Sequence, residues 1–117
     1  MLDNFPIDIS AKDLNSKLKK DSDRILIIDV RETSEILIAK LNISFIHLPL
    51  SEFQNWQINL KEILDPDKET VIICHAGIRS KNFGQWLLEN KYLSKVWNLT
   101  GGINEWSNDV DRSIPKY

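Results

Sequence analysis

Cys74, the only cysteine of the chain, has the residue type and the sequence context of a nucleophile. It directly follows the apolar run 71–73 and precedes a helical pattern, so a buried strand would deliver its thiol to a tight loop. Successive backbone N–H groups of such a loop can turn inward toward the sulfur as an anion-binding nest. Arg79 adds a fixed positive charge, and the start of the following helix contributes the positive end of its dipole. The sequence therefore predicts a loop that stabilises a thiolate.

The expected active loop contains Cys74 as the catalytic residue, followed by the loop and substrate-binding residues His75, Ala76, Gly77, Ile78, Arg79 and Ser80. Gly77 lets the backbone curl without a Cβ atom in the cavity, and Ser80 can supply a hydroxyl group near the helix start. We interpret His75 as an outward-pointing ring that shapes substrate selection, in preference to a general base. The Arg79 guanidinium can point toward an anionic substrate or toward a carboxylate such as Asp29, and the sequence leaves both open.

Length and composition exclude several classes of function. A chain of 117 residues with 42% hydrophobic content fits one domain, expected to span residues 1–117. Its 15 basic and 17 acidic residues give a formal charge of −2, too little positive charge for a nucleic-acid partner. No apolar run approaches the roughly 20 residues that cross a bilayer, and residues 1–4 do not begin a signal peptide, so we expect a cytoplasmic protein with no membrane partner. One cysteine and two histidines predict no disulfide and no metal site, and nothing in the chain indicates a cofactor.

Apolar runs alternate with helical patterns along the chain. After a short extended start, four runs predict strands, at residues 25–28, 45–48, 71–73 and 96–99. Helical patterns lie around them, at residues 10–18, 33–39, 51–64, 83–90 and 103–106. This alternation predicts an α/β fold with a mostly parallel central sheet flanked by helices. Ligands of such sheets bind at the carboxyl ends of the strands, where Cys74 and Asp29 both lie.

The predicted helix 51–64 opens with a capping-box pattern at Ser51. It carries Trp56, which we expect at the surface, whereas the other three tryptophans are expected to pack in or beside the core. His47 lies in a predicted strand and is expected to be a hydrogen-bonded structural residue.

Three motifs resemble, in order, those of the rhodanese domain, a sulfurtransferase fold of about this size. They are residues 28–32 (IDVRE), 74–80 (CHAGIRS) and 99–106 (LTGGINEW). The similarity extends over almost the whole chain and implies a cysteine that accepts a sulfane sulfur as a persulfide. The implied donor is a small sulfane compound such as thiosulfate or a protein persulfide, and the acceptor is a thiophile such as a sulfur-carrier protein. The tail 110–117 resembles the end of rhodanese domains attached to enzymes that activate such carriers.

Residues outside the loop are expected to support it. Asp29 and Arg31 are interpreted as an ion-pair scaffold behind the loop and not as catalytic groups. Gly101 and Gly102 either form a simple turn or bring a second backbone segment close to the loop, and the sequence favours neither. Residues 39–43 (AKLNI) replace a Gly-His pair and a Pro-Gly turn found in many rhodanese domains, so altered loop geometry is expected there.

Two further classes of function stay open. A non-catalytic binding module could use the same fold to dock a partner, with an incidental cysteine. A cysteine-dependent phosphatase would also use a cysteine and an arginine in one loop, but such enzymes place five residues between them. Here four residues separate Cys74 from Arg79, a shorter loop with less room for three phosphoryl oxygens. Sulfur transfer is therefore the favoured activity.

Overall fold

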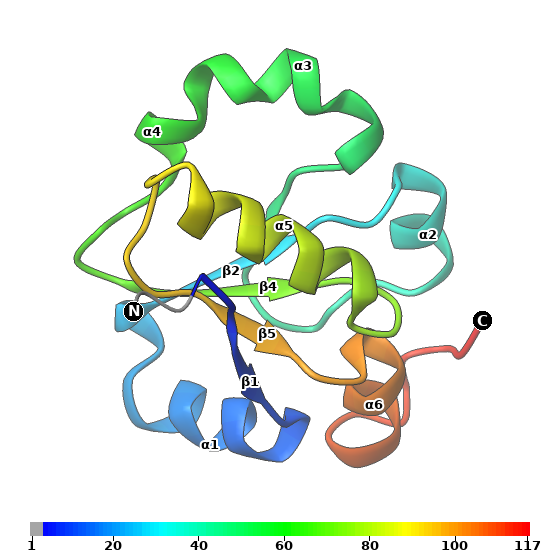
Figure 1. The fold of residues 1–117 in the computed structure, drawn as a ribbon. Coiled ribbons are helices and arrows are strands. Elements are labelled where there is room, and N and C mark those ends of the chain that lie inside the picture. The colour runs from blue at the N-terminus through cyan, green and yellow to red at the C-terminus, as the bar shows by residue number, and fades with distance from the viewer. Residues whose placement is uncertain (1–3) are drawn as a thin grey trace.

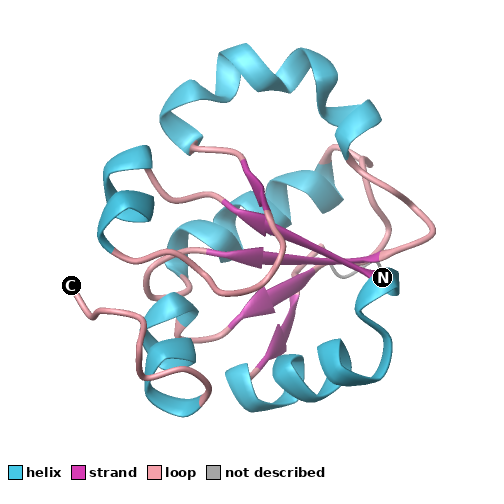
Figure 2. Cartoon of the chain, turned by 180° about the vertical axis from the view of Figure 1, so that it is seen from behind, coloured by secondary structure: helices cyan, strands magenta, loops and turns pink. Residues whose placement is uncertain are grey.

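The computed structural model describes residues 4–117. Within them, five strands form one parallel sheet in the order β1-β5-β4-β2-β3 (Figure 1, Figure 2). The strands are β1 (Ile7–Ile9), β2 (Ile25–Asp29), β3 (Ile46–His47), β4 (Glu69–Ile73) and β5 (Trp97–Leu99). The predicted α/β class, with a parallel sheet flanked by helices, is confirmed.

Helices cover both faces of this sheet (Figure 1). Those of the described chain are α1 (Ala11–Asp21), α2 (Thr33–Ile38), α3 (Phe53–Trp56), α4 (Leu60–Ile63), α5 (Ile78–Glu89) and α6 (Gly102–Asp109). Short 3₁₀ turns lie at η1 (Ser22–Arg24), η2 (Leu50–Glu52) and η3 (Gln57–Asn59). α1 and α6 pack on one face, and α3, α4 and α5 pack on the other.

Alternation along the central strand decides which face each side chain joins. Val71 and Ile73 are buried in the core beneath α1 and α6, whereas Ile72 and Cys74 are buried in the core beneath α5. The residue after β4 therefore points its side chain toward the helix that begins only four positions later, at Ile78.

The segment 50–64 differs from the single helix predicted over residues 51–64. It folds as η2, α3, η3 and α4, and the Ser51 hydroxyl donates to the Glu32 carboxylate instead of capping a helix. The prediction for Trp56 was also wrong: the ring is buried, its Nε1–H donates to the Pro49 carbonyl at 2.8 Å, and it packs edge-on against Phe83 of α5. The succession of short turns lets the segment bend over the sheet and keeps this large ring against the core.

Two other segments contribute to the core beneath α1 and α6. Ala39 and Leu41, in the stretch where the chain departs from the rhodanese pattern, are buried there. Ile114 of the C-terminal tail is buried in the same core, and its carbonyl accepts a hydrogen bond from the Ser107 hydroxyl at 2.6 Å. The tail is thereby held against α6 and directed toward the carboxyl edge of the sheet (Figure 1).

No helix within residues 4–117 is long and apolar enough to cross a membrane. Residues 1–3, which entered the sequence-based judgement about a signal peptide, lie outside the described part of the chain.

Candidate active site

Cys74 lies at the carboxyl end of the central strand, and its side chain is only 1% exposed. The loop that follows turns sharply at Gly77, whose φ of +98° belongs to the left-handed region that favours glycine. A Cβ atom there would also lie 3.1 Å from the Gly101 nitrogen and 3.3 Å from the Leu99 carbonyl oxygen. Glycine at this position thus permits both the turn and its close packing against the segment after β5.

Two polar groups contact the Cys74 sulfur. The Gly77 N–H donates to Sγ at 3.1 Å, and the Ser80 hydroxyl oxygen lies 3.2 Å from Sγ. The first N–H groups of α5, which begins at Ile78, have no partner within the helix, and they carry the positive end of its dipole. The Gly77 N–H and the positive end of the α5 dipole therefore favour negative charge at the sulfur, an arrangement suited to a thiolate or a persulfide anion.

Asn98 holds this arrangement together, and the sequence reading did not single it out. Its Oδ1 accepts a hydrogen bond from the Ser80 hydroxyl at 2.5 Å, and its Nδ2–H₂ donates to the Gly77 carbonyl at 3.2 Å and to Asp8 at 3.4 Å. The residue is 3% exposed. A lone amide in the otherwise apolar strand 96–99 was the available signal, because a buried amide requires hydrogen-bond partners.

A second backbone segment lies directly against the loop. The N–H of Ile103 donates to the Cys74 carbonyl at 2.9 Å, and the N–H of Asn104 donates to the His75 carbonyl at 3.2 Å. Gly102 has a φ of +58°, and a Cβ atom on it would overlap the Cys74 and His75 carbonyl oxygens. Of the two possibilities left open for the Gly101–Gly102 pair, the structure has the close approach.

Asp29 and Arg31 form a fully buried ion pair at the carboxyl end of β2. Arg31 Nη2 donates to Asp29 Oδ2 at 2.8 Å, Nε donates at 3.1 Å, and both side chains have 0% exposure. Burial by itself lowers the pKa of Arg31, but the hydrogen bonds to Asp29 and Tyr117 outweigh burial and raise that pKa above its usual value. The Arg31 carbonyl is in turn hydrogen-bonded to Nε2 of His47 at 2.6 Å, so His47 is a hydrogen-bonded strand residue as expected.

The Arg79 guanidinium binds a carboxylate, but that carboxylate belongs to Glu35 of α2 and not to Asp29. Arg79 Nη1 and Nη2 donate to the two Glu35 oxygens at 2.6 and 2.9 Å. These bonds, opposed by burial and aided by the Glu32 N–H and the Tyr117 hydroxyl, lower the pKa of Glu35 to about 2. The same pairing raises the pKa of Arg79. Sequence reasoning missed Glu35 because the contact joins residues 44 positions apart.

Tyr117, another residue that sequence reasoning missed, returns from the tail to the loop. Its ring stacks on His75 with the centroids 4.1 Å apart and the planes 12° apart. Its hydroxyl accepts from Arg31 Nη1 at 3.0 Å and donates to Glu35 at 2.7 Å. Burial raises the pKa of Tyr117 to about 12, so the hydroxyl keeps its proton at neutral pH. His75 is half-buried at the edge of the site, with one face of its ring covered.

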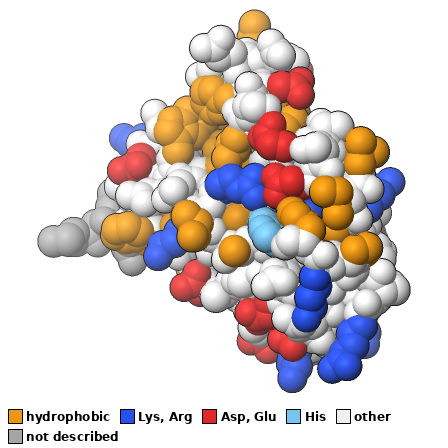
Figure 3. All heavy atoms as spheres, turned by 90° about the vertical axis from the view of Figure 1, so that its right-hand side faces the viewer, with side chains coloured by type: hydrophobic (Ala, Val, Ile, Leu, Met, Phe, Trp, Pro, Cys, Tyr) orange, Lys and Arg blue, Asp and Glu red, His pale blue; other side chains and the backbone are white. Residues whose placement is uncertain are grey.

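Charges of both signs are mixed at this edge of the molecule. Figure 3 looks onto the carboxyl edge of the sheet, where hydrophobic, acidic and basic side chains are interspersed without a broad area of one charge. Ile78 is 71% exposed beside the loop. The surface around Cys74 is therefore not a general anion-attracting patch.

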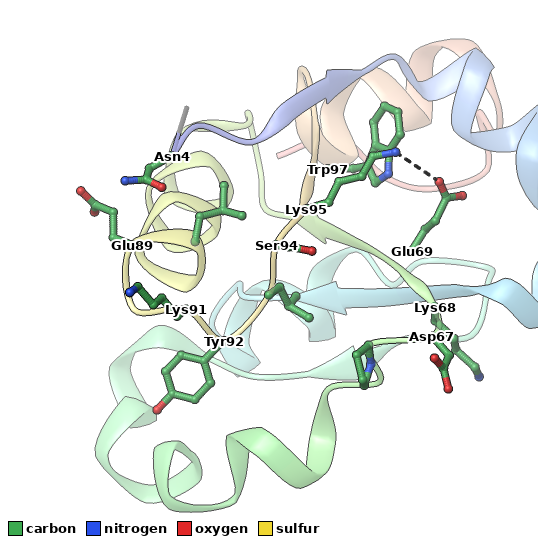
Figure 4. Close-up of a pocket in the computed structure, with 13 residues that line it drawn as sticks. Asn4, Asp67, Lys68, Glu69, Glu89, Lys91, Tyr92, Ser94, Lys95 and Trp97 are labelled. Carbon is green, nitrogen blue, oxygen red and sulfur yellow. Dashed lines mark ion pairs between the residues drawn. The ribbon is translucent and has the colours of Figure 1, made fainter. Parts of the chain in front are cut away.

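A separate pocket of about 690 Å³ lies at the opposite, amino end of the strands (Figure 4). It is lined by Lys95, Trp97 and Glu69 among others and contains none of the predicted site residues. The Lys95 ammonium lies 4.8 Å from the Trp97 ring centroid and 3.9 Å from a Glu69 oxygen, so its charge is already partnered.

Comparison with known proteins places this site in a family context. Residues 10–109 match the model of the Rhodanese-like domain. The chain is 40% identical to the Rhodanese-like/PpiC domain-containing protein 12, chloroplastic, of Arabidopsis thaliana, over 94% of this chain and 37% of that protein. It is 31% identical to YtwF of Bacillus subtilis (strain 168), a candidate sulfurtransferase by its name, over 88% of this chain and 92% of that protein.

A further relative is the Adenylyltransferase and sulfurtransferase UBA4 of Debaryomyces hansenii, 32% identical over 79% of this chain and 21% of that protein. The chain thus spans most of YtwF but only 37% and 21% of the plant and yeast proteins. The crystal structure of a rhodanese-like domain protein from Staphylococcus aureus has the same fold, with a TM-score of 0.72 at 22% identity, and covers 95% of this chain and 98% of that one. The chain therefore belongs to the rhodanese-like domain family.

Proposed function

We propose that this protein transfers sulfur through a persulfide on Cys74. The observation that carries the proposal is the placement of the Cys74 sulfur at the start of α5, within hydrogen-bond distance of the Gly77 N–H and the Ser80 hydroxyl. A deprotonated thiol in that position is a nucleophile that already accepts a hydrogen bond from the Gly77 N–H and lies at the positive end of the α5 dipole. A hydrogen-bond donor that is fixed in advance does not have to reorganise when negative charge moves from the thiolate to the outer sulfur of a persulfide.

The reaction consists of two balanced half-reactions. The Cys74 thiolate attacks the outer sulfur of the donor, and the bond between that sulfur and the rest of the donor breaks. With thiosulfate as donor, the electron pair of that bond leaves with sulfite. An acceptor nucleophile then attacks the outer sulfur of the persulfide, and the electron pair of the S–S bond returns to Cys74.

The proposed donor and acceptor are supported by the relatives. Thiosulfate and cyanide are the proposed assay pair. A protein persulfide donor and a sulfur-carrier acceptor are supported by the similarity to UBA4, whose name joins adenylyltransferase and sulfurtransferase activities. A cytoplasmic location and a single domain over residues 1–117 remain predictions from the sequence.

One observation supports a second function, a non-catalytic binding module. The Cys74 side chain is 1% exposed, and Arg79 is held on Glu35 instead of pointing toward the sulfur. A partner protein could bind the exposed surface around the active loop without contacting the buried thiol. The same orientation of Arg79 disfavours the phosphatase alternative, in which the arginine would have to bind phosphoryl oxygens beside the cysteine.

Formation of thiocyanate from thiosulfate and cyanide tests the proposal. We expect turnover with the wild-type protein and none with Cys74→Ser, which keeps the size of the side chain but removes the nucleophile. A parallel assay with p-nitrophenyl phosphate is expected to show no hydrolysis. If neither thiosulfate nor a protein persulfide yields transferable sulfur, the proposal fails and the binding module becomes the better account.

A further inference from the structure

Glu35 neutralises the charge of Arg79, the only arginine in the active loop. The bidentate contact with Arg79 is the strong, planar form of an arginine–carboxylate pair. The Glu35 side chain is 17% exposed and the Arg79 side chain 37% exposed, so the pair is partly shielded from solvent. Arg79 therefore brings little uncompensated positive charge to the site.

The Glu35 carboxylate is held in place from three directions. Besides the two Arg79 nitrogens, it accepts hydrogen bonds from the Glu32 N–H at 3.0 Å and from the Tyr117 hydroxyl at 2.7 Å. Tyr117 is itself fixed by stacking on His75 and by the hydrogen bond from the buried Arg31. A carboxylate with this many donors does not leave Arg79 easily, because each lost contact would have to be replaced.

The balance of charges around Cys74 then determines which sulfur donors can approach the thiolate. Asp29 and Arg31 neutralise each other, as do Glu35 and Arg79. A thiolate at Cys74 therefore meets an anionic sulfur donor as a like charge, and neither Arg31 nor Arg79 is free to offset the repulsion. The repulsion doubles when the donor carries two negative charges instead of one.

On the basis of the proposed sulfur transfer, we propose that Glu35 is a specificity-determining residue that selects against dianionic sulfur donors such as thiosulfate. Tyr117 is the positioning residue that keeps Glu35 on Arg79. The favoured donor class is the persulfide of a thiol, whose reacting group carries at most one negative charge.

Two donors that transfer sulfur by the same chemistry but differ in charge test this inference. Thiosulfate is a dianion that releases sulfite, and methanethiosulfonate is a monoanion that releases methanesulfinate. In Glu35→Gln the single amide oxygen can keep only one of the two bonds that Glu32 and Tyr117 donate to the separate carboxylate oxygens, and Arg79 is no longer neutralised. We expect kcat/KM to rise about fivefold for thiosulfate and about twofold for methanethiosulfonate, mainly through KM, because the Coulomb energy scales with donor charge.

Glu89→Gln is the matched control, since it removes the same charge from an exposed position at the far end of α5. Glu89→Gln is expected to change kcat/KM for thiosulfate and for methanethiosulfonate only through the lower net negative charge of the protein. That effect is the same in Glu35→Gln. Tyr117→Phe keeps the ring but removes the hydroxyl, and is expected to produce a smaller rise of the same kind. Equal factors for the two donors in Glu35→Gln would overturn the inference while leaving sulfur transfer intact.

Ionic strength gives a test that does not depend on any variant folding. In the wild-type protein, kcat/KM for thiosulfate is expected to rise with added salt, with about twice the slope seen for methanethiosulfonate, because salt screens like-charge repulsion. A fall with salt would show that the site attracts the anionic donor and would overturn the inference. Absence of transfer from both donors and from a protein persulfide would instead overturn the proposed function on which the inference rests.

Discussion

The backbone N–H of Ile103 donates to the Cys74 carbonyl at 2.9 Å, so the start of α6 is joined directly to the active loop. The segment that makes this contact carries Gly102 in the left-handed conformation, with no room for a side chain beside the loop. The shape of the active loop therefore depends on a second loop that lies 28 residues further along the chain.

Gly102→Ala is expected to destabilise the protein by about 2 kcal/mol or more, because a non-glycine residue is strained at this φ and its Cβ would displace the loop. Sulfur transfer by the remaining folded protein should fall as well. Gly84→Ala provides the comparison, since its Cβ would meet the side chains of Pro6 and Val96, away from the loop. Thermal unfolding and kcat measured on both variants check this, and a normal kcat in folded Gly102→Ala would contradict it.

Removing the Ser80 hydroxyl should slow sulfur transfer by up to about tenfold, the range of a neutral hydrogen bond, because its single proton is donated to Asn98 and its oxygen lies beside the sulfur. Ser80→Ala also leaves the Asn98 amide oxygen without its donor. Thr70→Val is a suitable control because the Thr70 hydroxyl is the one buried side-chain polar atom without a hydrogen-bond partner in the described chain. The control should keep full activity and equal or greater stability. Equal rates for Ser80→Ala and the wild-type protein would exclude a role for the hydroxyl.

Two Asp–Arg pairs of different burial should differ sharply in their contribution to stability. Asp29→Ala leaves the fully buried Arg31 without its charge partner and is expected to cost about 3–5 kcal/mol. Asp21→Ala removes an exposed pair with Arg24, 3.9 Å apart, and should cost at most about 1 kcal/mol. Urea unfolding of both variants measures the difference. Similar losses would mean that the buried pair is not a scaffold for the loop.

The stability that Glu35 provides should depend on pH in the acid range. Its pKa is about 2 in the folded protein, against an ordinary value of 4.5. Above about pH 4.5 the carboxylate is ionised in both the folded and the unfolded chain, and the stabilisation is complete. As the pH falls toward 2, the unfolded chain takes up the proton first and the stabilisation is lost.

The free energies of unfolding of wild-type protein and Glu35→Gln are therefore expected to differ most above pH 4.5 and to converge below it. Urea unfolding at several pH values between 3 and 7 provides the measurement. A difference that stays constant over this range would contradict the assigned ionisation of Glu35.

Local patterns predicted the framework of the fold well. The β-branched runs around Ile28 and Ile72 and the helix after Cys74 lie where expected, because strands buried on both faces and amphipathic helices leave a direct mark in the sequence. The segment 50–64 was mispredicted because the burial of Trp56 against α5 overrides the local helical pattern. Tertiary packing of this kind has no short-range signature.

The site, too, was only partly predictable, because local patterns mark some of its residues and tertiary contacts bring in the others. Cys74 and Gly77 could be found because they are neighbours in one loop with a recognisable motif. Glu35, Asn98 and Tyr117 could not, because each reaches the loop from a different element of the fold. A polar residue at any one of these positions is ordinary in sequence, and only the fold brings the three together.

Intact-mass measurement shows whether Cys74 carries a transferable sulfur. The purified protein is incubated with thiosulfate or a protein persulfide donor, freed of excess donor and weighed beside Cys74→Ser. A gain of about 32 Da, the mass of one sulfur atom, is expected on the wild-type protein alone and should disappear after cyanide is added. No gain with either donor, or an equal gain on Cys74→Ser, would contradict a persulfide on Cys74.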